Sequence, residues 1–411
     1  MAVDMKRRYA RMLVKVGMNV QKGQPVLIEA TPEGWAFADL VAEEAYAAGA
    51  SNVVISYLDK HKLMLDALNR DPAEVAQYAP WDGDKFRTLM DQKAATIRLE
   101  SEYPDLMRGL DDDKAHAIFA QIDGLRNIMR SVMAKNHTQW CIAVVPNQEW
   151  AEKIYPGEDK SKVLDMFWNQ VYKLCYLDET CDIEAVWAEK DARRAVIGEK
   201  LDSFDLESLH FTSSNGTDLT VGLGKQSHFG LPKEIRERMA ADPNHVRFHA
   251  NMPTEEHCTT PQRYKTNGIV YSTRPLLVGG KMVDRFWIRF ENGKAVDCGA
   301  EEGEEMLRSI IATDENSGYL GEVALVEYHS PISMSGLTYY TTLIDENASC
   351  HLALGRGFVS KDVTEEDGVQ MPYNQSQIHI DFMFGAPDTQ VIGTTRDGKQ
   401  VVIFKDGDYA F

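Results

Sequence analysis

The spacing of apolar residues changes near residue 205, and this change constrains the fold more than any other feature of the sequence. Before it, segments with helical spacing of apolar residues alternate with short apolar runs at residues 25–30, 52–57, 95–99 and 140–145. Strands that alternate with helices in this way form βαβ units, in which consecutive strands lie parallel. We therefore predict an α/β domain, a mostly parallel sheet with flanking helices, for residues 1–205.

After residue 205 the sequence is rich in the turns that join antiparallel strands. Asn215-Gly216, Gly279-Gly280, Asn292-Gly293 and Asp397-Gly398 each lie between two apolar runs. Such pairs favour the positive φ angles that tight hairpins need. We predict that residues 206–411 form a second, α+β domain rich in antiparallel strands.

Composition excludes several classes of protein. Lys and Arg number 44 against 63 Asp and Glu, a net charge of −19, which repels phosphate backbones. No apolar run approaches the roughly 18 residues that span a bilayer, and the N-terminus lacks the apolar core of a signal peptide. Six cysteines without a CxxC pair favour reduced, mostly buried thiols. We expect a cytoplasmic protein with no nucleic-acid or membrane partner.

Common nucleotide and hydrolase motifs are also missing. The first apolar run is not followed by GxGxxG, which excludes the usual dinucleotide site. The chain has neither the HExxH of single-zinc peptidases nor the GxSxG of serine hydrolases. Any hydrolytic site must be built from other residues.

The segment His379-Ile380-Asp381 is one candidate for chemistry. In a strand, residues two apart point to the same face, so His379 and Asp381 would project together while Ile380 and Phe382 pack on the other side. An imidazole beside a carboxylate suits a first-row divalent metal. A solvated strand face, or a simple His–Asp hydrogen bond, is the alternative.

Further candidates occur in the same half of the chain. Glu322 interrupts an apolar segment, and a buried carboxylate is costly unless it is paired or binds a cation. An ion pair with an arginine is the alternative for Glu322, and a satisfied core histidine is the alternative for His351. The adjacent Glu255 and Glu256 are either a solvated pair or additional ligands. Together these residues provide the side chains of a two-metal hydrolytic site.

Segments along the whole chain resemble those of the thermophilic metalloaminopeptidase family. The resembling segments are residues 9–17, 20–24, 215–219, 252–256, 320–326, 345–351 and 379–383. The resemblance implies that two divalent ions, zinc or cobalt, are held by Glu256, Glu322, His351, His379 and Asp381. It also implies removal of N-terminal residues from peptides with a free amine, and a homodimer. In that case the first domain would limit access to the site and form the dimer.

The sequence departs from the family pattern at two places. Phe358 stands where the family usually has a tyrosine thought to assist catalysis, and its ring cannot donate a hydrogen bond. We expect a substitute hydroxyl, from Tyr339, Tyr340 or Tyr373, or a bound water to fill this role, and an enzyme that works slowly on its metals alone is the alternative. His257-Cys258 replaces an apolar pair, and we expect His257 to face solvent, with a role as a further ligand as the alternative.

Glu255 and Glu322 are both candidates for the catalytic group that carries the proton. The sequence does not decide between them. Two other functions compete with an aminopeptidase: a dipeptidase or other metal-dependent amidohydrolase, and a catalytically impaired metal-binding relative, which Phe358 alone supports.

Overall fold

The computed structural model describes residues 3–136, 138–230, 241–242, 245–278, 281–359 and 363–411. The chain forms two compact units: unit 1 comprises Met1–Glu189 and Asp242–Pro253, and unit 2 comprises Lys190–Ala241 and Thr254–Phe411. The division therefore falls within helix α9 (Ile183–Ser203), whereas the spacing of apolar residues in the sequence changes near residue 205. The segment Asp242–Pro253 belongs to unit 1, and its strand β7 (Asn251–Met252) pairs there with β4 (Trp140–Val144).

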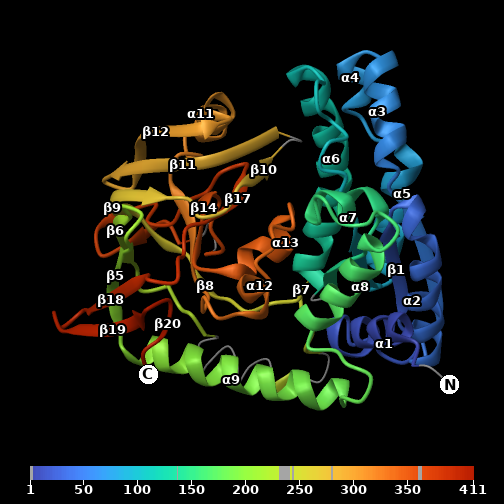
Figure 1. Ribbon diagram of the computed structural model, residues 1–411, viewed down its shortest axis with the longest axis horizontal. Helices are drawn as coiled ribbons and strands as arrows, with labels where there is room; N and C mark the ends of the chain where they lie inside the picture. Colours follow the sequence, from blue (N-terminus) through green and yellow to red (C-terminus); the bar gives the residue numbers. More distant parts are fainter. Residues whose placement is uncertain (1–2, 137, 231–240, 243–244, 279–280, 360–362) are drawn as a thin grey trace. The chain divides into compact units, whose positions relative to one another are not determined.

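Unit 1 contains a parallel sheet, as predicted (Figure 1). Among its described residues the sheet has five strands in the order β2-β1-β3-β4-β7, and the pairings between them are parallel. The three strands not yet given bounds are β1 (Pro25–Ala30), β2 (Asn52–Tyr57) and β3 (Ala95–Glu100). Because β1 lies between two neighbours, five of its six residues are buried.

Helices alternate with these strands along the chain. They are α1 (Met5–Met12), α2 (Trp35–Ala47), α3 (Lys60–Asn69), α4 (Pro72–Val75), α5 (Pro80–Asp91), α6 (Asp112–Asn136), α7 (Gln148–Ile154) and α8 (Val163–Leu174). In the described part of the chain, no helix is both long and apolar enough to cross a membrane.

Unit 2 is built mainly from antiparallel strands, which confirms the second part of the fold prediction. Its larger sheet has nine strands within the described residues, in the order β10-β11-β9-β6-β5-β18-β19-β20, with β12 paired to β11. The strands are β5 (Leu206–Thr212), β6 (Asp218–Leu223), β9 (Pro261–Tyr271), β10 (Leu276–Val278), β11 (Lys281–Glu291), β12 (Lys294–Glu302), β18 (Gln390–Thr395), β19 (Gln400–Lys405) and β20 (Asp408–Tyr409).

The predicted hairpin turns meet different outcomes. Asn292 and Gly293 both have positive φ, 50° and 84°, and join β11 to β12. The apolar run before Gly279-Gly280, residues 268–278, is divided between two strands, since β9 ends at Tyr271 and β10 begins at Leu276. Gly279-Gly280 lies outside the described residues.

A smaller antiparallel sheet positions the candidate residues. In the described residues of unit 2 it has four strands in the order β17-β14-β13-β8. These are β8 (His257–Thr259), β13 (Leu320–Leu325), β14 (His351–Gly355) and β17 (His379–Met383). Short elements complete the unit: α11 (Glu304–Ile311), α12 (Pro331–Met334), α13 (Thr342–Asp345), a 3₁₀ turn (Glu346–Ala348), β15 (Glu365–Glu366) and β16 (Val369–Gln370).

One face of the smaller sheet is part of the hydrophobic core of unit 2. Val323, Leu352 and Phe382 are each at most 1% exposed and belong to the same apolar cluster as Phe211 and Ile288 of the larger sheet. Burying these side chains gives about 25 cal/mol for each Å² of apolar surface removed from water. The sheet is therefore fixed by apolar packing on one side, and its other face is available for polar residues.

Candidate metal centre

The register of the smaller sheet brings the predicted ligands to one face. Ala353 of β14 pairs with both Glu322 of β13 and Asp381 of β17. Residues paired across a sheet share a face, and so do residues two apart along a strand. His351 and His379 therefore lie on the same side as the two carboxylates, opposite the apolar cluster.

Glu322 lies at the centre of this group. One of its carboxylate oxygens lies 3.7 Å from Nε2 of His351, and the other lies 3.1 Å from Nε2 of His379. Nε2 of His351 is also 3.1 Å from Glu256, and Nε2 of His379 is 3.4 Å from Asp381. These contacts bring all five predicted ligands together.

Both imidazoles are oriented by backbone carbonyl groups. Nδ1 of His379 lies 2.6 Å from the carbonyl oxygen of Arg356, and Nδ1 of His351 lies 3.4 Å from that of Ser349. A ring that donates its Nδ1–H to a carbonyl keeps Nε2 free to bind a metal, an arrangement typical of metal-binding histidines.

The site is buried and strongly acidic. Although burial opposes these shifts, neighbouring carboxylates raise the pKa of His351 well above its usual range and that of His379 to about 11, and the two imidazoles lower the pKa of Glu322. Burial, followed by the charges of Glu256 and Asp381, raises the pKa of Glu346 well above its usual range.

Two imidazoles cannot neutralise this group of carboxyl groups. Even if both were protonated, their two positive charges would face the carboxyl groups of Glu256, Glu322, Glu346 and Asp381. Buried charges are stable when they are paired or bind cations. The donor set and its excess of negative charge therefore fit divalent metal ions.

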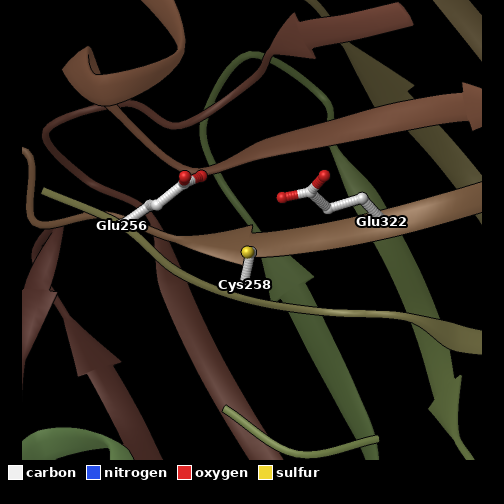
Figure 2. Close-up of side chains that lie close together, drawn as sticks. All are labelled: Glu256, Cys258 and Glu322. Carbon is white, nitrogen blue, oxygen red and sulfur yellow. The ribbon is translucent and has the colours of Figure 1, made fainter. Parts of the chain in front are cut away.

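Two residues near this group received no role from the sequence. Glu346 belongs to the 3₁₀ turn before β14, where no strand periodicity links it to the ligands. Cys258 was noted only for its place in the chain. It lies two residues after Glu256, so the alternation that joins His379 to Asp381 also puts its sulfur on the ligand face. Figure 2 shows the carboxylates of Glu256 and Glu322 extending toward each other, with the Cys258 sulfur pointing into the space between them.

Glu255 has different surroundings from Glu256. Its carboxylate lies 3.6 Å from Nζ of Lys190, and its backbone N–H donates to Oδ1 of Asn347 at 2.6 Å. Burial lowers the pKa of Lys190, an effect that Glu255 opposes. Glu256, and not Glu255, is therefore the member of the pair that contacts a predicted histidine ligand.

The prediction that His257 faces solvent is wrong. Its side chain is 5% exposed, with Nε2 3.1 Å from the carbonyl oxygen of Arg194 and Nδ1 2.9 Å from the hydroxyl of Tyr409. Burial lowers the pKa of His257 to about 4, so the ring is neutral. Because His257 alternates with Glu256 and Cys258, it points away from the ligand face and is not placed to be a further ligand.

Phe358 lies beside the ligands. Its ring centroid is 5.1 Å from that of His379, and 64% of the residue is exposed. The backbone N–H of Phe358 donates to Oγ1 of Thr260 at 2.8 Å, which fixes the start of this loop. An apolar ring therefore occupies a place where a hydroxyl could reach the site.

Two of the three tyrosines considered as substitutes use their hydroxyls elsewhere. Tyr339 is fully buried and donates to Oγ of Ser335 at 2.8 Å. Tyr373 donates to Glu366 at 2.7 Å and is also nearly fully buried. Tyr340, the third tyrosine considered, is half-buried and has a φ of 58°.

All six cysteines lie among the described residues and are free thiols, four of them buried. This agrees with the pattern expected from their spacing. The prediction that most of the cysteines are buried is confirmed.

Comparison with known proteins identifies the family. The model of the thermophilic metalloprotease family (M29) matches residues 4–409. Aminopeptidase AmpS of Bacillus subtilis is 35% identical over 408 residues, 98% of each chain, and aminopeptidase T of Thermus aquaticus is 32% identical over 97% of each chain. The solved structure of wild-type AmpT from Thermus thermophilus superposes with a TM-score of 0.86 at 28% identity, covering 99% of both chains. The resemblance seen in the sequence is thus confirmed, and the chain belongs to the thermophilic metalloprotease family M29 and is a metalloaminopeptidase.

Proposed function

We propose that this enzyme uses two divalent ions, zinc or cobalt, to remove N-terminal residues from peptides. Glu256 and His351 would hold one ion, His379 and Asp381 the other, and Glu322 would contribute to both. The observation that carries the proposal is the orientation of the two imidazoles, which both present Nε2 to carboxylates while Nδ1 faces a backbone carbonyl group. The donor set of nitrogen and oxygen atoms suits zinc and cobalt.

When bound, the two ions would activate a water molecule as nucleophile and polarise the scissile carbonyl group. The protein must still move a proton from the nucleophile to the leaving amine. Glu322 is already in contact with both imidazoles, which leaves Glu255 as the better candidate. The ammonium group of Lys190 lies 3.6 Å from this carboxylate and holds it in place by a charged contact.

The substrate in this proposal is a peptide with a free N-terminus. A free N-terminal amine can bind a metal ion through its nitrogen lone pair, which explains a preference for chain ends. The homodimer is proposed from the family resemblance alone, and the cytoplasmic location from that resemblance together with the cysteine pattern of the sequence. Unit 1 would limit access to the site and form the dimer.

Metal analysis tests the two-metal proposal directly. Protein prepared without chelator is expected to contain about two zinc or cobalt ions per chain, the stoichiometry of a two-metal hydrolytic site. Dialysis against a chelator should remove both the ions and the activity, and added zinc or cobalt should restore both. Protein that stays metal-free after soaking in zinc and in cobalt would contradict the proposal.

Phe358→Tyr tests the alternative of an impaired enzyme. The change adds one hydroxyl beside His379, and turnover is expected to rise about tenfold or more, about 1.4 kcal/mol of barrier. Loss of one oxyanion donor costs about 10²–10³ in well-studied enzymes, which limits the possible gain. The measurement is kcat on an unblocked peptide.

Two further variants control this experiment. Phe358→Leu keeps the position apolar and should leave turnover near that of the unmodified enzyme. Tyr340→Phe removes the hydroxyl of the third tyrosine considered as a substitute. If Phe358→Tyr has no effect while Tyr340→Phe lowers kcat, Tyr340 already supplies the donor and the expected gain is wrong.

A further inference from the structure

We infer that the sulfur of Cys258 is an additional ligand of the metal ion held by Glu256 and His351. This inference rests on the proposed two-metal site. It adds a donor that the family resemblance does not supply, because Cys258 stands in a pair that is apolar in the family pattern. The side chains that carry it are shown in Figure 2.

The separations between the donor atoms suit a single ion. One ligand atom from each of Glu256, Cys258 and Glu322 lies within 4.8 Å of the other two. Zinc binds sulfur at about 2.3 Å and carboxylate oxygen at about 2.0–2.2 Å, so two ligands of one ion are at most about 4.5 Å apart. The observed limit of 4.8 Å is close to this separation, so side-chain rotation can bring the three donors onto one ion.

The backbone around Cys258 keeps its sulfur on the ligand face. Cys258 pairs with Ala324 of β13, and Ala324 pairs in turn with His351 of β14. The three residues form one row across the sheet, and the residue in the middle has only a methyl group. Sulfur and imidazole can therefore approach a common ion over Ala324.

Another thiol next to a predicted ligand shows the opposite arrangement. Cys350 precedes His351 in the chain, but it belongs to the apolar cluster of unit 2 and its Sγ lies 3.6 Å from the carbonyl oxygen of Val326. Cys350 is thus a matched control: it is a buried thiol next to a predicted ligand in the chain, but its sulfur faces the hydrophobic core.

The chemistry of this bond is simple and affects the choice of metal. On binding, the thiol gives its proton to solvent and the sulfur lone pair forms the bond to the ion. Sulfur binds zinc, cobalt and cadmium better than the harder magnesium, calcium or manganese ions. Cys258 would make this enzyme more selective for the first group than the nitrogen and oxygen ligands alone.

Absorption spectroscopy of cobalt-loaded protein tests the inference without measuring activity. Metal-free enzyme, Cys258→Ala and Cys350→Ala are each titrated with Co²⁺, after circular dichroism shows that all three are folded. The unmodified protein and Cys350→Ala should show a sulfur-to-cobalt charge-transfer band in the near ultraviolet. Cys258→Ala should lose this band and keep the visible d–d bands of bound cobalt.

X-ray absorption of the zinc form gives a second readout, since a zinc–sulfur shell at about 2.3 Å should be present in the unmodified protein and absent in Cys258→Ala. Visible bands without a charge-transfer band in the unmodified protein would overturn the inference and leave the two-metal proposal intact. A charge-transfer band that persists in Cys258→Ala would also overturn it. If none of the three proteins binds cobalt or zinc, the inference and the two-metal proposal both fail.

Discussion

Glu322→Gln is expected to abolish aminopeptidase activity and to remove metal from a folded protein. Glutamine keeps the length of the side chain but loses the negative charge and one of the two oxygens that face His351 and His379. Changing an outer partner of a metal ligand typically costs about 10–100-fold in affinity or activity, and loss of a shared ligand should cost more. Metal content and kcat/KM, measured on the same preparation, check this result.

Glu327→Gln is the matched control for this variant. Glu327 lies two residues beyond the end of β13, and its carboxylate pairs with Arg193 at 2.5 Å. The control should keep its metal and its activity. A Glu322→Gln enzyme that retains both metals and turns over peptide at the unmodified rate would show that Glu322 is not a shared ligand.

Acetylation of the substrate's N-terminal amine is expected to abolish turnover. Acetylation turns the basic amine into a neutral amide, whose nitrogen can neither bind a metal ion through a basic lone pair nor carry a positive charge. Sites built to bind a polar group reject analogues that lack it by about 10⁴–10⁵, so an N-acetylated peptide should show no detectable cleavage. Mass spectrometry of paired blocked and unblocked peptides gives the measurement.

The same peptide with an amidated C-terminus is the control. It should lose residues from its N-terminus at the normal rate, because the proposed recognition does not involve the other end. Internal cleavage of the acetylated peptide would instead show an endopeptidase. Turnover restricted to dipeptides would favour the dipeptidase alternative.

Sequence periodicity predicted the parts of this fold that depend on local pattern. The strand at residues 25–30 could be predicted because its residues are nearly all apolar, and in the structure five of the six are buried. Alternation alone placed His379 and Asp381 on one face, with Ile380 and Phe382 on the other. The wider ligand set came from the family motifs, since no local rule connects Glu322 with His351 before the strand register is known.

The parts that could not be predicted depend on contacts between distant segments. The buried His257 ring contacts the hydroxyl of Tyr409, 152 residues later, and the carbonyl group of Arg194, 63 residues earlier. The strand Asn251–Met252 joins unit 1 through pairing with β4, although it belongs to the half of the chain in which the predicted hairpin turns occur. The role inferred for Cys258 needed the register of β8 against β13, which depends on the whole smaller sheet.

The two faces of the smaller sheet allow stability and chemistry to change separately in evolution. Val323, Leu352 and Phe382 alternate along the same strands with the candidate ligands, but they belong to the hydrophobic core. Substitutions among these apolar residues alter the free energy of unfolding by amounts that depend on packing. They do so without replacing any donor atom on the opposite face. A lineage can therefore adapt such an enzyme to a hotter or cooler habitat while its chemistry stays unchanged.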